Sequence, residues 1–427
     1  MRERRQVCLD VAQARGRLTS VTGAVFHRYG VVWAGTSGVG AGVSGQYRIG
    51  SITKTLTAVL VMQARDAGLL SLDDPVGKHL GAGGYADVPL RQLLSHTSGM
   101  QSEPVGPWWE RSRGTDFARL AEANDGSGRV ARAGDYYHYS NLGYALLGEV
   151  LACVTGRPWR TLVSQVLLGP LGMSRTSYLP RPTAQPGWSV DHFTGVRTLE
   201  PLTETGAMAP AGQLWSTVED LMLWGQFLAG DRPDLLDPST LHEMSTPVTD
   251  SYGLGLRLSA NAGGVLVGHS GSMPGFIASL FVDPGSGIGA AVLANATTGI
   301  DPERLAIDLI DGDFIEHVPL PWQPTLAVPP EVEGLPGLWF WGNTAIELRW
   351  HNEGLVLRAL ATPEREPWRF ELAEGRLVGV AGYHRGETLH VHRRDDGTIG
   401  HLECATFIYT RSPYDPEAPI PGGHARR

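Results

Sequence analysis

The stretch GSITKTLTAVL, residues 50–60, places a serine at the start of an apolar run with helical spacing and a lysine three residues further on. Side chains three residues apart share one helix face, so Lys54 is expected to reach the Ser51 hydroxyl. Burial lowers the pKa of a lysine, and a neutral amine accepts the proton that makes serine a nucleophile. The stretch therefore predicts an activated serine, although a helix-capping serine and a surface lysine have the same spacing.

Two later motifs add polar side chains of the kind that hydrolytic sites use. Tyr139 and Asn141 lie two residues apart just before a helical pattern, a spacing that lets both point the same way. His269, Ser270 and Gly271 end a run that is typical of a strand. The backbone N–H groups at the start of the first helix would suit a developing oxyanion.

The three motifs, in this order, resemble those of the serine β-lactamase and penicillin-binding protein superfamily. They are most similar to those of the branch with class C β-lactamases, D-stereospecific peptidases and related esterases. The stretches LLSHTSGM and PAGQLWSTVEDL also resemble this branch, and the resemblance covers about residues 15–312. The resemblance implies an α/β (α+β) fold in which an antiparallel sheet flanked by helices joins an all-helical lobe. It also implies acyl transfer through an acyl-enzyme, with neither a metal nor an organic cofactor.

The resemblance assigns a role to each motif residue. Ser51 would be the acylated nucleophile, and Lys54 and Tyr139 would share the proton transfers. Tyr139 would act as a base only where a neighbouring cation such as Lys54 lowers its pKa. Asn141 would bind the substrate amide or hold Lys54. The backbone N–H groups of Ser51 and Ser272 would form the oxyanion hole.

His269 stands where many members of the superfamily carry lysine, and a histidine is largely neutral near pH 7. This favours a small ester or amide (esterase-like) over β-lactams and D-Ala-D-Ala peptides, whose carboxylate needs an anchor. A β-lactamase or D-amino-acid peptidase remains an alternative, as do a penicillin-binding or sensing protein and an acyltransferase. The sequence offers no acidic residue assignable as a deacylating base.

Composition patterns divide the chain into four segments. We expect a catalytic domain at 1–318, a proline-rich linker at 319–336, an all-β domain at 337–411 that forms a small antiparallel barrel, and a disordered tail at 412–427. The barrel is interpreted as a gate or a dimerisation module. In the first domain, the patterns predict a β-hairpin at 20–40 and strands within 252–296. They predict helices at 1–16, 51–67, 141–156 and 216–230. The helix at 216–230 is expected to begin with a capping box at Ser216.

The bulk properties limit the partners and the compartment. The formal charge of −9 argues against nucleic-acid binding, and no apolar run is long enough for a signal peptide or a membrane span. The three cysteines fit no zinc spacing and indicate a reducing compartment. We expect a cytoplasmic protein with a small-molecule substrate, no membrane partner and a possible homodimer, unless a different start codon hides an export signal.

Other motifs have structural interpretations. GAGVSG at 40–45 is not followed directly by a helix, so a turn is favoured over a dinucleotide site. His96 is expected to end a short helix that Gly99 closes, which is a structural role. His390 and His392 share a strand face without a third ligand nearby, so no metal site is expected there.

Overall fold

The computed structural model describes residues 2–40, 42–230, 232–261, 263–312, 317–415 and 417–418. The chain forms two compact units: the first comprises residues 1–189 and 199–322, and the second comprises 190–198 and 323–427. The sequence analysis placed 190–198 in the first domain, whereas the structure groups this short segment with the second unit. Most of the tail expected to be disordered lies outside the described residues.

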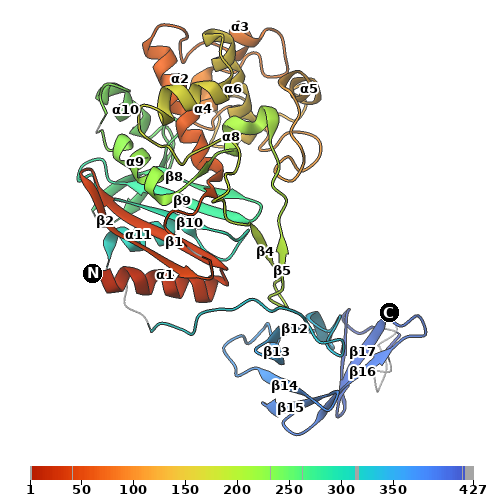
Figure 1. Ribbon diagram of the computed structural model, residues 1–427. Helices are drawn as coiled ribbons and strands as arrows, with labels where there is room; N and C mark the ends of the chain where they lie inside the picture. Colours follow the sequence, from red (N-terminus) through yellow and green to blue (C-terminus); the bar gives the residue numbers. More distant parts are fainter. Residues whose placement is uncertain are drawn as a thin grey trace. The chain divides into compact units, whose positions relative to one another are not determined.

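A six-stranded antiparallel sheet forms the base of the first unit, in the order β2-β1-β10-β9-β8-β7 (Figure 1). The N-terminal hairpin joins the sheet because β1 pairs with β10, with Val21 opposite Ala294. The strands are β1 Ser20–His27, β2 Gly30–Gly38, β7 Arg257–Asn261, β8 Gly264–Met273, β9 Phe276–Val282 and β10 Gly289–Ala294.

Both faces of the sheet are covered. Helices α1 (Arg2–Gly16) and α11 (Pro302–Asp311) pack on one face in a cluster with Val21, Val25 and Val292. The other face meets α9 (Val218–Leu228) and the helical lobe. Burial on two sides explains why β9 and β10 are buried along their whole length instead of alternating with polar residues.

The helical lobe is built around α2 (Thr53–Asp66), which packs on α6 (Asn141–Thr155) and α8 (Ala209–Gly212). Every α2 residue from Thr53 to Met62 is buried, so this helix is central rather than amphipathic. The remaining elements are η1 Gly50–Ile52, α3 Val76–Leu80, α4 Leu90–Leu94, α5 Phe117–Ala123, α7 Trp159–Leu162, the π-helical turn η2 Val163–Leu168, η3 Gly206–Met208 and α10 Pro238–Ser245. Two short ladders pair β3 Tyr47–Arg48 with β6 Trp215–Ser216 and β4 Trp188–Val190 with β5 Arg197–Leu199.

The capping box predicted at Ser216 is wrong by one residue. Thr217 caps α9, and its hydroxyl accepts a hydrogen bond from the Asp220 N–H. Ser216 belongs to β6, where its hydroxyl bonds the Thr176 hydroxyl at 2.8 Å. The pattern was misread because adjacent Ser and Thr both satisfy the cap preference, and the β3–β6 pairing decides between them.

The second unit contains a closed eight-stranded antiparallel barrel, in which each strand pairs with the next and β18 returns to β11. Its strands are β11 Gly337–Trp341, β12 Thr344–His351, β13 Gly354–Ala359, β14 Trp368–Ala373, β15 Arg376–Ala381, β16 Thr388–Arg393, β17 Ile399–Cys404 and β18 Phe407–Thr410. Closure removes exposed strand edges, which stabilises so short a set of strands.

The segment expected to be a linker is partly structural. Val332 and Leu335 are fully buried in the barrel core beside Trp339, whose indole N–H donates to the Leu335 carbonyl at 2.7 Å. Residues 190–198 also belong to this unit, since the Trp350 N–H donates to the Phe193 carbonyl at 2.8 Å.

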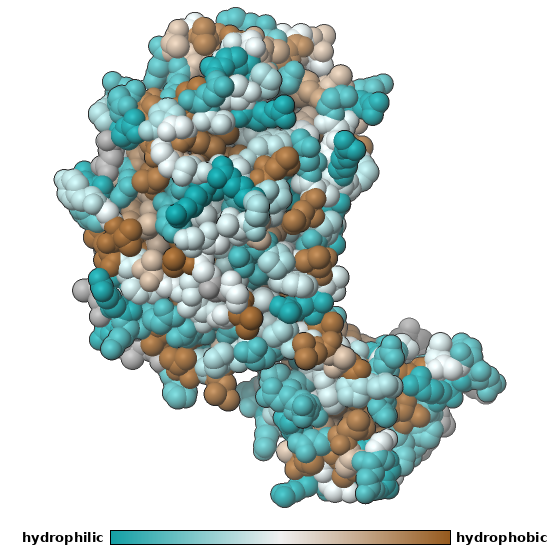
Figure 2. Space-filling view, viewed as in Figure 1, coloured by the Kyte–Doolittle hydropathy of each residue, from teal (hydrophilic) through white to brown (hydrophobic). Residues whose placement is uncertain are grey.

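On the face shown in Figure 2, hydrophilic residues surround scattered apolar ones in each unit. None of the helices in the described residues combines the length and the apolar character that a bilayer span requires.

Leu335→Ala should destabilise the barrel by about 2–4 kcal/mol, because it removes a fully buried side chain and leaves a cavity. The control is Leu326→Ala in the same proline-rich segment, where the side chain is 91% exposed. Calorimetry of the whole chain should show a lower melting temperature of the barrel for Leu335→Ala and no such change for Leu326→Ala. Equal transitions for the two variants would contradict the structure of this segment.

Candidate active site

The turn that carries Ser51 lies directly against strand β8. Gly50 has φ +51°, and a methyl group on it would come within 2.6 Å of the Ser272 nitrogen. A methyl group on Gly271 would come within 2.0 Å of the Ile49 carbonyl oxygen. Only glycines permit this approach, because one needs a positive φ and both lack space for a side chain. The contact places the N–H groups of Ser51 and Ser272 on adjoining backbone segments.

Lys54 is fully buried, and its amine contacts three acceptors from three parts of the chain. The Nζ atom lies 2.9 Å from Ser51 Oγ, 2.6 Å from Asn141 Oδ1 and 2.7 Å from the Ala211 carbonyl oxygen. Burial lowers the pKa of Lys54 to about 7, against the opposing charges of Glu103 and Glu110. Near neutral pH a substantial fraction of this amine is therefore uncharged and able to take a proton.

Lysine is rare in this chain. Of its 35 Lys and Arg residues, only Lys54 and Lys78 are lysines. Arginine keeps its proton at all physiological pH values, so it cannot replace a lysine that works as a base. The presence of one of only two lysines at the buried position 54 therefore indicates a chemical role for its amine. This count is available from the sequence alone, although the motifs do not include it.

Tyr139 lies beside Lys54, whose Nζ is 5.0 Å from the centre of the tyrosine ring. Burial raises the pKa of Tyr139 well above its ordinary value, although a hydrogen bond with Ser51 acts in the opposite direction. The sequence analysis considered a Tyr139 pKa lowered by Lys54, whereas the structure shows the reverse because desolvation dominates. Tyr139 therefore stays a neutral phenol that can donate or relay a proton.

His96 holds the Tyr139 segment in place. Its Nδ1 accepts the Ser140 N–H at 3.0 Å, and its carbonyl accepts the His138 N–H at 2.7 Å. Its ring lies 4.1 Å from the ring of Tyr139 between centres. The sequence analysis treated His96 as only a helix end, so its contacts with the second motif were missed.

The end of α4 differs from the prediction that Gly99 closes it. The helix ends at Leu94, and His96 itself adopts the left-handed conformation with φ 56°. The Thr97 N–H bonds the Gln92 carbonyl at 2.9 Å, which completes a Schellman-type cap. Glycine normally fills this position, because a side chain there costs about 1–2 kcal/mol. The contacts of His96 with the second motif offset that cost.

His269 is buried and uses both ring nitrogens within the protein. Nε2 accepts from the Tyr252 hydroxyl at 2.9 Å, and Nδ1 donates to the Ser270 carbonyl at 2.5 Å. Burial, with Lys54 nearby, lowers the pKa of His269 to about 3. It is therefore neutral at physiological pH and presents no cation to a substrate. Ser270 is partly exposed and Ser272 is exposed at the end of the same strand.

Two glutamates of the loop before α5 were not anticipated by the sequence analysis. Glu103 accepts hydrogen bonds from Asn141 Nδ2 at 2.7 Å and from the Trp109 indole at 2.6 Å. Burial raises the pKa of Glu110, and the like charge of Glu103 adds to this. The loop has no periodic pattern or motif, so only the fold brings these carboxylates near Lys54.

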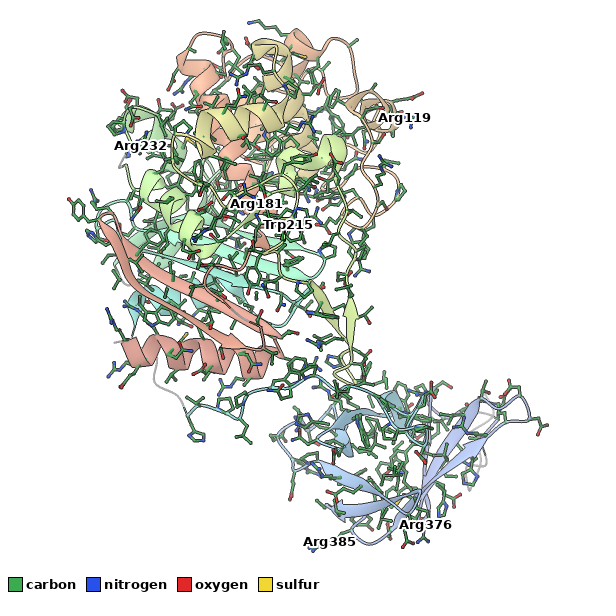
Figure 3. The ribbon with its side chains drawn as sticks, viewed as in Figure 1. Arg119, Arg181, Trp215, Arg232, Arg376 and Arg385 are labelled. Atoms are coloured by element: carbon green, nitrogen blue, oxygen red, sulfur yellow. The ribbon has the colours of Figure 1, made fainter. Side chains whose placement is uncertain are left out.

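A buried guanidinium adjoins this acidic loop. Arg48 donates to the Thr203 carbonyl at 3.0 Å and to Gln213 Oε1 at 3.2 Å, and it lies over the ring of Trp215, which Figure 3 labels. Burial lowers the pKa of Arg48 to about 10, against the attraction of Glu110.

The residues that the sequence predicts for the site do not all lie in one cluster. The structure brings Ser51, Lys54, Tyr139 and Asn141 into one cluster and sets the β8 backbone at Gly271 and Ser272 against it. His269 is turned into the core. The centre of its ring lies 6.1 Å from the centre of the Tyr139 ring, so His269 packs against the cluster from the core side.

Comparisons with known proteins identify the family of the chain. The model of the Beta-lactamase family matches residues 8–312, so the chain belongs to this family. Residues 328–411 match a family described as a domain of unknown function, DUF7586.

Three curated relatives have sequences similar to part of this chain. Penicillin-binding protein 4 of Amycolatopsis lactamdurans is 29% identical over 62% of this chain and 76% of its own length. The D-alanyl-D-alanine-carboxypeptidase/endopeptidase AmpH of Escherichia coli K12 is 28% identical over 63% and 75%. Beta-lactamase-like protein 2 of Dictyostelium discoideum is 29% identical over 54% of this chain, which spans only 46% of that protein.

Solved structures share the fold. A D-stereospecific amidohydrolase from Streptomyces sp. aligns with a TM-score of 0.63 and 28% identity, over 73% of this chain and 98% of that one. An octameric penicillin-binding protein homologue from Pyrococcus abyssi aligns with a TM-score of 0.65 over 93% of this chain and 97% of that one. The second is 22% identical, so the likeness concerns the fold alone.

Gly271→Ala should reduce kcat about 10²–10³-fold, because the added methyl group forces β8 away from the Ser51 turn and displaces an oxyanion donor. Gly83→Ala is the matched control, since a methyl group there meets no atom within 4 Å. Steady-state kinetics on an activated ester, with circular dichroism to check folding, would measure the effect. A folded Gly271→Ala protein with unchanged kcat would exclude this backbone contact from catalysis.

The pH profile of kcat/KM should rise through a single ionisation at about pH 7, because only the neutral form of Lys54 accepts the serine proton. The pKa of His269 is lowered to about 3 and that of Tyr139 is raised, so neither titrates between pH 5 and 9. Lys54→Arg should abolish turnover. A profile that is flat from pH 5 to 9 would rule out Lys54 as the base.

Proposed function

We propose that the protein is a serine hydrolase that cleaves a small ester or amide through an acyl-enzyme on Ser51. The observation that carries this proposal is the buried Lys54 amine, 2.9 Å from Ser51 Oγ, with its pKa lowered to about 7. A base poised near the working pH is the requirement for activating a hydroxyl nucleophile. Membership of the Beta-lactamase family supports the same reaction class.

The proposed reaction proceeds in two halves. Ser51 Oγ attacks the carbonyl carbon while its proton moves to Lys54, and the N–H groups of Ser51 and Ser272 receive the oxyanion. The proton then passes through the Tyr139 phenol to the leaving group, and the acyl-enzyme remains. Water then attacks the acyl carbon and gives a proton to the same neutral amine. Lys54 passes this proton to Ser51 Oγ as the bond between the acyl carbon and Oγ breaks, so the acid leaves and Ser51 is restored.

Asn141 and Glu103 act as positioning residues in this scheme. Asn141 Oδ1 holds the Lys54 amine, and its Nδ2 donates to Glu103. Both Glu103 carboxylate oxygens accept hydrogen bonds, one from Asn141 and the other from Trp109. This occupancy favours a structural role for Glu103 over that of a deacylating base.

The charges around Ser51 favour substrates that lack a carboxylate. His269 supplies no cation because it is neutral and satisfied within the core. Glu103 and Glu110 contribute negative charge near Lys54. A neutral ester or amide therefore fits better than a β-lactam, whose carboxylate would be repelled.

A second candidate is the amide bond of a D-amino acid derivative. The same two carboxylates would attract the ammonium group of such a substrate. The likeness to the D-stereospecific amidohydrolase, at 28% identity, supports this candidate.

The test compares kcat/KM on p-nitrophenyl butyrate, nitrocefin and a D-alanyl p-nitroanilide for the wild type and Ser51→Ala. We expect ester turnover to exceed nitrocefin turnover, and Ser51→Ala to lose it by about 10³-fold or more. Ser286→Ala is the control, because that serine is exposed in the β9–β10 loop.

The other outcomes have defined meanings. Preference for the D-alanyl substrate would select the second candidate, and preference for nitrocefin would contradict the charge argument. A burst that stalls after one turnover would indicate a penicillin-binding or sensing role. Turnover that survives Ser51→Ala would overturn the mechanism.

A further inference from the structure

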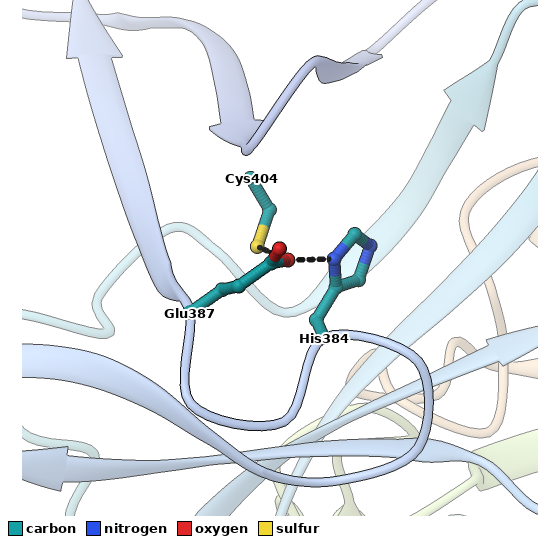
Figure 4. A group of neighbouring side chains, drawn as sticks. All are labelled: His384, Glu387 and Cys404. Atoms are coloured by element: carbon teal, nitrogen blue, oxygen red, sulfur yellow. Dashed lines mark hydrogen bonds and ion pairs between the residues drawn. The ribbon is translucent and has the colours of Figure 1, made fainter.

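Three side chains of different chemistry meet in the barrel unit, which contains none of the residues that the proposed hydrolase mechanism uses. His384 Nδ1 lies 2.6 Å from Glu387 Oε2, and Cys404 Sγ lies 3.6 Å from the same oxygen (Figure 4). The nitrogen, oxygen and sulfur atoms all lie within 4.8 Å of one another. His384 and Glu387 belong to the loop between β15 and β16, and Cys404 ends β17.

The cluster combines a buried interior with an opening to solvent. His384 and Cys404 are buried with essentially no exposed surface, whereas the Glu387 side chain is 42% exposed. The carboxylate thus links an enclosed nitrogen and sulfur to the surface. Such a site gives an ion a path of entry and leaves a coordination position for water.

The histidine ring is held from its far side. His384 Nε2 lies 3.1 Å from the Tyr409 hydroxyl, which belongs to β18. When Nδ1 binds an ion, Nε2 carries the proton and can donate it to this oxygen. Histidine ligands of metals are oriented by such a partner on their second nitrogen.

The loop that carries two of the side chains is itself firmly held. The Gly386 N–H donates to the Gly379 carbonyl at 2.8 Å, and the Gly379 N–H donates to the Glu387 carbonyl at 2.8 Å. A methyl group on Gly379 would lie 2.0 Å from the His384 carbonyl oxygen, so this backbone contact excludes any side chain. The backbone of this loop is therefore held in place by the barrel, while the Glu387 side chain keeps some freedom to move.

A simple hydrogen-bond network explains the cluster less well. A thiol is a weak donor, and the distance of 3.6 Å to a carboxylate gives little stabilisation. A bound divalent cation would account for the position of the thiol, because a coordinated thiol loses its proton and binds the ion directly.

We propose that His384, Glu387 and Cys404 bind a Zn²⁺ ion, with water as the fourth ligand. Zinc takes nitrogen, oxygen and sulfur at about 2.0–2.3 Å in tetrahedral geometry, which spaces the ligands about 3.3–3.8 Å apart. The S–O separation already matches, and the N–O separation needs to open by less than about 1 Å. Mg²⁺ and Ca²⁺ prefer oxygen ligands alone, so they do not fit this set.

The proposed site is independent of the hydrolase mechanism and concerns the barrel. The ion would join the β15–β16 loop to the end of β17. The cluster could not be predicted from sequence motifs, because Cys404 lies 17 residues from Glu387 and no paired-cysteine motif is present.

The test titrates the reduced, metal-free full chain with Co²⁺, whose thiolate-to-metal charge-transfer absorption reports cysteine coordination. The titration uses a His392→Gln background, because His392, His401 and Glu403 form a second possible ligand group at the surface. We expect the absorption to saturate at one equivalent of Co²⁺, and Zn²⁺ to displace it. Zn²⁺ should also raise the barrel's melting temperature by several degrees.

Two variants and a control identify the ligands. Cys404→Ser should remove the absorption, and Glu387→Gln should weaken Co²⁺ binding about tenfold or more. Cys8→Ser is the matched control, since Cys8 is also a buried cysteine outside any disulfide bond but lies in α1. Glu387→Gln alters a partly exposed side chain, so it provides a folded test if Cys404→Ser does not fold.

The proposal is overturned if the full chain shows no thiolate absorption with Co²⁺, or if the absorption persists in a folded Cys404→Ser protein. Metal binding that disappears entirely with His392→Gln would assign the ion to the surface group and overturn it equally.

Discussion

The contact between the Lys54 amine and the Ser51 hydroxyl is the constraint around which the catalytic unit is built. A fully buried amine needs an acceptor for each N–H, and an unsatisfied one costs about 1–3 kcal/mol. Ser51, Asn141 and Ala211 supply the three acceptors from η1, α6 and α8. These elements are therefore held in register around the amine, and its burial among them lowers the pKa of Lys54 to about 7.

Two backbone features place the other groups of the candidate site beside this contact. The glycines at 50 and 271 let β8 contact the turn that carries Ser51, so that the N–H groups of Ser51 and Ser272 adjoin each other. His96 adopts a strained left-handed conformation, and its contacts with Ser140 and Tyr139 fix the position of Tyr139 and the start of α6. Strain of this kind persists where surrounding contacts over-determine a residue, which is common beside active sites.

The sequence predicted the elements whose signals are local, and it missed those that depend on the fold. The juxtaposition of Ser51 and Lys54 with the second motif follows from spacing, as do α1, α6 and the N-terminal hairpin. Glu103 and the His384 cluster could not be found, because loops without periodicity bring their side chains together. His269 was expected to be largely neutral near pH 7, and its burial, which the sequence does not reveal, lowers its pKa to about 3. Ser216 and Gly99 show that cap residues remain ambiguous until the strand pairing and the helix end are known.

The most direct test of the central claim is the pKa of Lys54 itself. Because the chain has only two lysines, protein labelled with ¹³C at lysine Cε should give two signals, and Lys78→Arg assigns them. NMR titration should show the Lys54 signal changing at about pH 7, more than three units below an ordinary lysine. A Lys54 signal that titrates near pH 10 would contradict the account, because a protonated amine cannot activate Ser51.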